Sequence, residues 1–248
     1  MADPAGLFPY EPSGLFLLDK PAGPTSHDAV AWARRTFDTP NVGHCGTLDP
    51  LATGLLLMVM GESLKLQNLF TAETKVYRGT FRFGVRTDTD DLAGKTLGGP
   101  VGDLSSVDEP RLKELFSRFT GTFEQKVPLF SAVKVKGRKL YEWARKGVPV
   151  DLPVKTVTIR RFDLLRFSPP EAEFIVECTK GTYVRSLARD VGELLGTGGV
   201  LSSLCREAVG SFHRGKAYVW KGERDFRRDD VLSAFIPHHA LLDMKNGG

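Results

Sequence analysis

The stretch from residue 75 to residue 85, KVYRGTFRFGV, alternates between two sets of side chains. One set is Val76, Arg78, Thr80 and Arg82, and the other is Tyr77, Gly79, Phe81 and Phe83. A period of two with one apolar-leaning side predicts a strand of an antiparallel sheet that buries one face. Any fold for this chain must therefore pack one face of a sheet against a core that the other elements help to form.

The other elements mix strands and helices without a regular βαβ rhythm. Further strands are expected over residues 14–23, 51–61, 157–167, 173–181 and 199–212. Helices are expected over residues 25–37, 62–70, 106–121 and 182–196. The first helix has Thr25 or Ser26 as a cap, and the last ends at a glycine. This irregular order predicts an α+β fold with a mixed, mostly antiparallel sheet.

The composition is that of a folded protein. The chain has 248 residues, of which 41% are apolar and 26% charged, so a sizeable core can form. A net charge of +4 allows a polyanionic partner without demanding one.

The cysteines and the apolar runs indicate where the protein works. Cys45, Cys178 and Cys205 are odd in number and far from CxxC spacing, which argues against a disulfide framework or a zinc site. The first residues lack the basic and apolar regions of a signal peptide. The apolar run LLLMVM, residues 55–60, is too short to cross a bilayer. We expect a soluble cytoplasmic protein without a membrane partner.

Asp49 is the one carboxylate in the stretch GHCGTLDPLATG, residues 43–54. Leu-Asp-Pro is a natural turn sequence, so Asp49 can be a turn residue that bonds nearby N–H groups. Alternatively, a carboxylate on a rigid, glycine-flanked loop can act alone as a nucleophile on a closely approaching substrate. The residues around it leave both readings open.

Three more side chains have a structural and a functional interpretation. Arg185, in KGTYVRSLARD, is either a paired helix arginine or the cation that keeps a catalytic acid ionised. Tyr77 is either a core tyrosine or a platform on which a base stacks. His44 has no HxH or HExxH partner, which argues against a metal site.

The segment 131–150 carries six lysines and arginines, interleaved with Tyr141 and Trp143. Such a run is either a solvated face or an RNA-binding surface. The acidic run RTDTDD at 86–91 fails the EF-hand pattern, because Leu92 occupies a ligand position and the glycine comes one place late. It predicts a loop.

Together these pieces resemble the TruB family of tRNA pseudouridine synthases. The motifs that carry the resemblance follow one another along nearly the whole chain: LLDKPAGPTSHDAV, GHCGTLDPLATGLL, KVYRGTFRFGVRTDTDD, FSAVKVKGRKLYEWARKG, CTKGTYVRSLARDVGE and LSSLCREAVG. The resemblance implies the pseudouridine synthase fold, with helices flanking the sheet and a central catalytic cleft. It implies an isomerase that converts uridine 55 in the T-loop of tRNA to pseudouridine, with no metal and no organic cofactor.

The same resemblance assigns roles to individual residues. Asp49 matches the catalytic aspartate, Tyr77 the residue that stacks on the target base, and Arg185 the partner of Asp49. His44 matches the residue that helps displace the base, Lys20 the lysine that buttresses the site, and Leu204 an apolar wall of the base pocket. An insertion near residues 124–152 matches the part that grips RNA, and the residues expected to do so are Lys134, Lys136, Arg138, Lys139 and Tyr141. Cys45 and Cys205 depart from the family, which often has threonine and arginine there.

We expect one catalytic domain over residues 1–248, without the complete C-terminal PUA domain that bacterial relatives usually carry, acting as a monomer on the T-arm stem-loop of tRNA. Two rival functions remain. One is a non-catalytic tRNA-folding chaperone on the same fold, although the presence of Asp49, Tyr77 and Arg185 weighs against it. The other is a hydrolase with Asp49 as nucleophile, which would release a free base or sugar.

Overall fold

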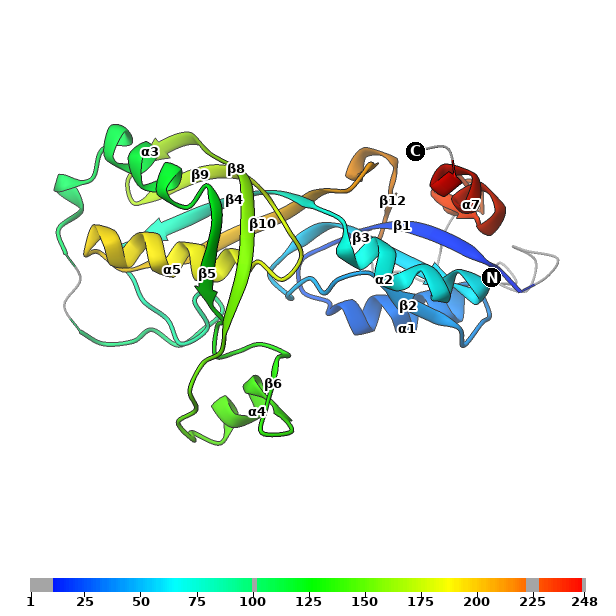
Figure 1. The fold of residues 1–248 in the computed structure, drawn as a ribbon, viewed down its shortest axis with the longest axis horizontal. Coiled ribbons are helices and arrows are strands. Elements are labelled where there is room, and N and C mark those ends of the chain that lie inside the picture. The colour runs from blue at the N-terminus through cyan, green and yellow to red at the C-terminus, as the bar shows by residue number, and fades with distance from the viewer. Residues whose placement is uncertain (1–10, 100–101, 222–227, 247–248) are drawn as a thin grey trace. The chain divides into compact units, whose positions relative to one another are not determined.

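The structure is a computed structural model that describes residues 11–99, 102–221 and 228–246. The chain forms two compact units (Figure 1). The first joins Met1–Val76 to Cys205–Gly248, and the second is the continuous segment Tyr77–Leu204. The expectation that residues 1–248 act as a single catalytic domain stays a prediction.

The first unit is built on two buried strands, of which one is buried along its whole length and the other from its second residue onward. β1 (Gly14–Lys20) and β3 (Thr53–Met60) pair antiparallel, with Leu17 opposite Leu57. Both are nearly continuous apolar runs, which suits strands covered on both faces. The other strands of the unit are β2 (Val42–His44), β11 (Phe212–His213), β12 (Tyr218–Val219), β13 (Phe235–Pro237) and the end of β10 (Gly199–Val209).

Helices close the first unit around an aromatic core. α1 (Ser26–Thr36) begins at Thr25, whose side chain accepts from the Asp28 backbone while the Asp28 carboxylate accepts from Thr25. Its buried side brings Trp32 against Phe16 of β1, with ring centroids 6.1 Å apart. The remaining helices are η2 (Gly61–Leu66), α2 (Gln67–Ala72), η4 (Arg214–Lys216), α6 (Arg228–Ser233) and α7 (His238–Asn246).

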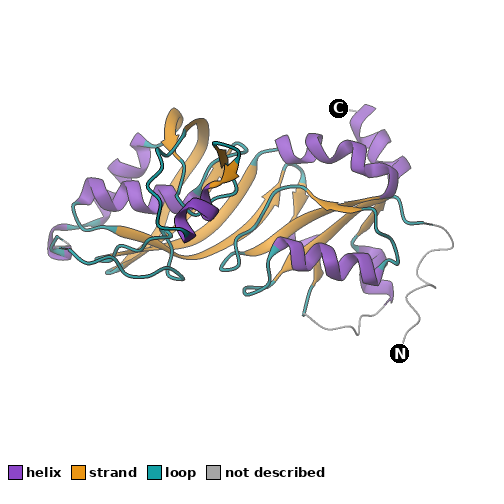
Figure 2. Cartoon of the chain, turned by 90° about the horizontal axis from the view of Figure 1, so that it is seen from below, coloured by secondary structure: helices purple, strands orange, loops and turns teal. Residues whose placement is uncertain are grey.

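The second unit is a sheet with helices packed on its strands. Its strand order is β10-β4-β9-β8-β5. The strands are β4 (Lys75–Phe83), which enters from the first unit, β5 (Gly121–Lys126), β8 (Val154–Ser168) and β9 (Glu171–Cys178). Its helices include η3 (Leu104–Ser106), α3 (Glu109–Arg118) and α5 (Val184–Leu195). Figure 2 separates helices and strands by colour.

Four phenylalanines form the centre of the second unit. Phe116 of α3 stacks on Phe162 of β8 with centroids 4.0 Å apart, and Phe81 of β4 lies 4.2 Å from Phe174 of β9. Alternation along β4 and β9 puts Phe81 and Phe174 on the buried face of the sheet, as expected for half-buried antiparallel strands.

The predicted α+β class is confirmed. Among the described strands most pairs are antiparallel, and β1–β12 and β3–β10 are parallel. The expected helix at 62–70 differs in detail, because it runs as a 3-10 helix over Gly61–Leu66 and becomes α-helical at Gln67. No side chain caps its first turn, which removes the usual stabilisation of an α-helical start.

Candidate active site

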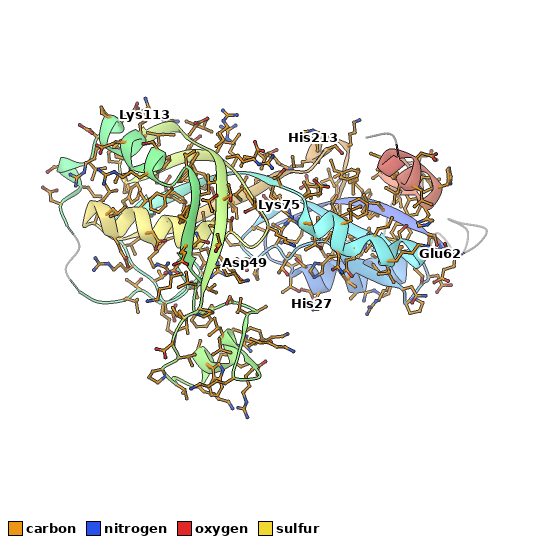
Figure 3. The ribbon with its side chains drawn as sticks, in the orientation of Figure 1. His27, Asp49, Glu62, Lys75, Lys113 and His213 are labelled. Carbon is orange, nitrogen blue, oxygen red and sulfur yellow. The ribbon has the colours of Figure 1, made fainter. Side chains whose placement is uncertain are left out.

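Asp49 lies in the first unit, in the loop between β2 and β3 (Figure 3). The Ala52 amide donates to the Asp49 carbonyl at 3.0 Å, so the backbone forms a turn there. On one side, Ser26 Oγ donates to the Leu48 carbonyl at 3.1 Å and accepts from the Leu48 amide at 2.9 Å. On the other side, the Gly23 amide donates to the Pro50 carbonyl at 2.8 Å. Both neighbours of Asp49 are thus fixed by the segment that leads into α1.

Lys20 lies at the end of β1, fully buried. Its ammonium donates to the carbonyls of Pro21 and Pro24, each at 2.8 Å. Burial lowers the pKa of Lys20 to about 8, the negative charge of Asp49 opposes that shift, and the positive charge of Arg206 adds to it. Lys20 therefore lies within electrostatic reach of Asp49, and its role in supporting the site stays a prediction.

His44 ends β2, opposite Met58 of β3. Its ring meets that of His27 edge to face, with centroids 5.9 Å apart. Burial lowers the pKa of His44 to about 4, helped by the charges of His27 and Arg206, so the ring is neutral at physiological pH. Its Nδ1 is buried and accepts or donates no hydrogen bond among the described residues. His44 is therefore available as a neutral, flat ring and not as a cation.

Tyr77 and Leu204 both belong to the second unit. Gly79, on the same side of β4 as Tyr77, has no room for a side chain, because a Cβ would stand 2.4 Å from the Ser203 carbonyl and 3.2 Å from Leu204 Cδ1. The close approach of β10 to β4 at this glycine brings Leu204 beside the strand face that carries Tyr77. Both side chains are partly exposed.

Arg185 is buried in the first turn of α5. Its guanidinium donates to the carbonyls of Thr89 at 2.7 Å and Phe130 at 3.1 Å, and its Nε lies 3.7 Å from the Asp91 carboxylate. These contacts fix the plane of the guanidinium from two loops of the second unit. Asp49 lies in the first unit, and its pairing with Arg185 stays a prediction.

The acidic run at 86–91 is a loop, as predicted, but it does more than link β4 to the helices that follow. One turn along α5 from Arg185, Arg189 lies 3.1 Å from the carboxylate of Asp90. Burial raises the pKa of Asp90 to about 6, against the opposing effect of the arginines. The ion pairs of Asp90 and Asp91 with these arginines were not predicted from the sequence. The available signal was the spacing of Arg185 and Arg189, which places both on one helix face.

The basic segment folds as a small hairpin followed by a helix. Its elements are β6 (Lys134–Val135), β7 (Arg138–Lys139) and α4 (Leu140–Arg145). Lys136 and Gly137 turn the chain with positive φ values of 51° and 79°. Lys134, Lys136 and Arg138 are exposed.

The aromatic residues of this segment already carry cations of their own. Arg138 lies over the Trp143 ring at 5.4 Å, and Lys139 and Arg145 lie over the Tyr141 ring at 5.5 and 5.3 Å. The rings hold these charges in place, so the segment presents an ordered set of cations more than a bare stacking surface.

No helix in the described part of the chain has the length and apolarity needed to cross a bilayer. Within the same residues, no group of three or more histidines, cysteines, aspartates or glutamates is placed to hold a metal ion.

The sequence is similar to those of known proteins over most of its length. Residues 34–184 match the family model described as the N-terminal domain of TruB family pseudouridylate synthase. The tRNA pseudouridine synthase B of Bordetella pertussis is 44% identical over 204 residues, covering 82% of this chain and 84% of the relative. That of Caldicellulosiruptor saccharolyticus is 42% identical over 230 residues, covering 93% and 76%.

Solved structures give the same answer at the level of the fold. A crystal structure of a Cbf5-Nop10-Gar1 complex contains a chain with a TM-score of 0.68 and 26% identity, over 90% of this chain and 60% of that one. The structure of an H/ACA RNP bound to a substrate RNA containing 2′-deoxyuridine gives a TM-score of 0.64 at 23% identity. The family match and the relatives above 40% identity decide the matter: this chain belongs to the TruB family of pseudouridine synthases, and it is an isomerase.

Proposed function

We propose that this isomerase converts uridine 55 in the T-loop of tRNA to pseudouridine, with Asp49 as its catalytic carboxylate. The relatives named tRNA pseudouridine synthase B support tRNA as the substrate. Position 55 and the T-arm follow from the motifs that this chain shares with the family. The protein acts as a cytoplasmic monomer.

The observation that carries the proposal is the way Asp49 is held. Its two neighbours are bonded to residues 23–26 on either side, and the ammonium of Lys20 interacts with its charge. A turn aspartate needs no such support, whereas a carboxylate that must meet a reacting carbon does. Lys20 attracts the ionised carboxylate from inside the protein, where the interaction is screened less than in water.

The reaction needs one carboxylate and no external reagent. The C1′–N1 bond of the uridine breaks, the uracil turns, and a C1′–C5 bond forms. C5 then loses its proton to solvent, and N1 gains one. Asp49 can add to C1′, add to C6 of the base, or assist removal of the C2′ proton, and each route uses the ionised carboxylate.

The uracil must leave its stack before Asp49 can reach it. Extruding a base costs a few kcal/mol. Stacking on Tyr77 returns roughly 1–3 kcal/mol, and Leu204, which lies beside the strand face of Tyr77, supplies an apolar wall. His44, a flat neutral ring, occupies space left by the displaced base. Contacts of the exposed cations of segment 131–150 with phosphates provide the remaining affinity.

From the motifs that this chain shares with the family, we propose Arg185 as the partner of Asp49. Its carbonyl and Asp91 contacts hold the guanidinium in one orientation, which is what a planar, bidentate partner requires.

The experiment is tritium release from a T-arm stem-loop that carries C5-labelled uridine, with wild-type protein and with Asp49→Asn. We expect release by the wild type and none by the variant, with equal RNA affinity. Release by both proteins would remove Asp49 from the mechanism. A wild type that binds the RNA but releases no tritium would favour the tRNA-folding alternative, and a free base in the supernatant would indicate a hydrolase.

A further inference from the structure

Arg206 is the largest fully buried side chain of the described residues, with an exposure of 1%. It lies in the part of β10 that belongs to the first unit, where it pairs in register with Gly54 of β3. Within the part of the chain that the structure describes, its guanidinium forms no ion pair. Burying a cation without a carboxylate partner costs desolvation free energy, so Arg206 is expected to have a role that offsets this cost.

The hydrogen bonds of Arg206 all serve the Asp49 loop. Nε donates to the carbonyl of Leu55 at 2.7 Å, and Nη2 donates to the carbonyl of Gly46 at 3.1 Å. Gly46 lies in the loop before Asp49 and Leu55 in β3 after it, so one rigid guanidinium ties together the chain on the two sides of Asp49. The planar, fixed geometry of the group sets the distance between those two sides.

Two glycines make this contact possible. Gly54 has a φ of +99°, and a Cβ on it would stand 2.4 Å from the Arg206 carbonyl oxygen. Gly46 has a φ of +112°, and a Cβ there would lie 3.6 Å from Arg206 Nη1. Positive φ values of this kind are open to glycine and rarely to other residues. Close packing against Arg206 therefore excludes a side chain at Gly54, whereas at Gly46 the positive φ alone favours glycine.

The charge of Arg206 also reaches the groups around Asp49. It is among the causes that lower the pKa of Lys20 and of His44. Lys20 responds to Asp49 and to Arg206 in opposite directions, which shows that all three charges share one neighbourhood.

We infer that Arg206 is a positioning residue for the isomerisation: its buried guanidinium clamps the chain on both sides of Asp49 and so fixes the carboxylate for reaction. The inference rests on the proposed role of Asp49. Arg206 is assigned no contact with the base or the ribose, because the hydrogen bonds of its guanidinium go to main-chain carbonyls. It acts through the main chain of the loop.

The test compares Arg206→Lys and Arg206→Gln with wild type and with Arg34→Lys as a matched control. Arg34 also donates to a carbonyl, that of Val42 at 3.3 Å, but away from the loop. Lysine keeps the charge but lacks the planar guanidinium whose Nε and Nη2 donate to the two carbonyls in a fixed geometry, so it separates the clamp from the charge. Single-turnover tritium release, RNA affinity, thermal unfolding and amide hydrogen exchange of residues 46–55 are measured for each protein.

We expect both Arg206 variants to lose roughly 10- to 100-fold in the single-turnover rate, because small misplacements of a reacting group have effects of this size. RNA affinity should stay within about twofold, and exchange should quicken in residues 46–55 only. Arg34→Lys should match wild type in all four measurements. A folded Arg206→Lys that keeps the wild-type rate and loop protection overturns the inference.

Failure of the proposed function gives a different result. If wild type releases no tritium, or if Asp49→Asn still does, the function or the role of Asp49 is wrong. Hydrogen exchange then still tests the clamp, because unchanged protection of residues 46–55 in either folded Arg206 variant excludes it. If Arg206→Gln does not fold, Arg206→Lys carries the test.

Discussion

The ammonium of Lys20 makes the stability of this protein depend on pH in an unusual direction. An unfolded lysine has a pKa near 10.5, and burial lowers that of the folded state to about 8. Between these values the unfolded chain binds more protons than the folded one, so stability rises with pH. Below pH 8 Lys20 is charged in both states, and the full free-energy cost of burying its charge lowers the stability of the fold. Above pH 10.5 Lys20 is neutral in both states, and that cost is absent.

The size of the effect follows from the shift. A change of about 2.5 pKa units at about 1.36 kcal/mol each corresponds to about 3 kcal/mol, of which about 2.5 kcal/mol is regained by pH 10. The assay is urea unfolding of wild type and Lys20→Met at several pH values from 7 to 10. Groups that titrate alike in both proteins drop out when the two unfolding free energies are subtracted, so the pH dependence of the difference reports Lys20.

Wild type should gain about 2–3 kcal/mol relative to Lys20→Met over this range. Repeating the pair of proteins in an Asp49→Asn background tests the link to the site. The carboxylate charge raises the pKa of Lys20, so its removal should move the rise to lower pH. A difference between wild type and Lys20→Met that does not change with pH would refute the reasoning.

Three further perturbations test other parts of the structure. Gly54→Ala should destabilise the fold by more than about 2 kcal/mol in urea unfolding, because its Cβ would meet the Arg206 backbone, whereas Gly23→Ala, also at positive φ but in open space, should cost only the backbone strain of about 1 kcal/mol. Asp91→Ala removes the buried carboxylate beside Arg185 and should cost about 3 kcal/mol in the same assay; a loss below about 1 kcal/mol would show that the pair contributes little. A triple variant with Lys134→Gln, Lys136→Gln and Arg138→Gln should flatten the dependence of T-arm binding on salt by up to about one unit of slope per lost phosphate contact. The control Lys113→Gln, at a lysine that pairs with Glu109, should leave the slope unchanged. An unchanged slope in the triple variant would exclude a role of segment 131–150 in phosphate binding.

The local elements of the fold were predictable because each is specified by neighbouring residues. The alternation of 75–85 identified β4, the buried runs identified β1 and β3, and the capping residue Thr25 located the start of α1. The division of the chain into two units was not predictable. It depends on which distant segments pack together, and no single stretch carries that information.

The candidate site shows the same limit. Motifs pointed to Asp49, Lys20 and Arg185, but Arg206 entered the sequence analysis only as a letter in the last motif. Its role arises from two carbonyls that lie far from it along the chain. Asp91 was missed for a related reason, since its partner, Arg185, lies in α5 and is far from it along the chain. Hydrogen bonds to the main chain leave no mark on residue type at the accepting position.

The make-up of the first unit has a consequence for how the protein is synthesised. Residues 77–204 are continuous, so the second unit has all its strands once that stretch has left the ribosome. The first unit needs residues from both ends of the chain, and contacts of such long sequence separation form slowly. Because Arg206 comes from the later segment, the loop that carries Asp49 cannot reach its final shape until residue 206 has been made. Catalytic competence should therefore appear as one of the last events of folding.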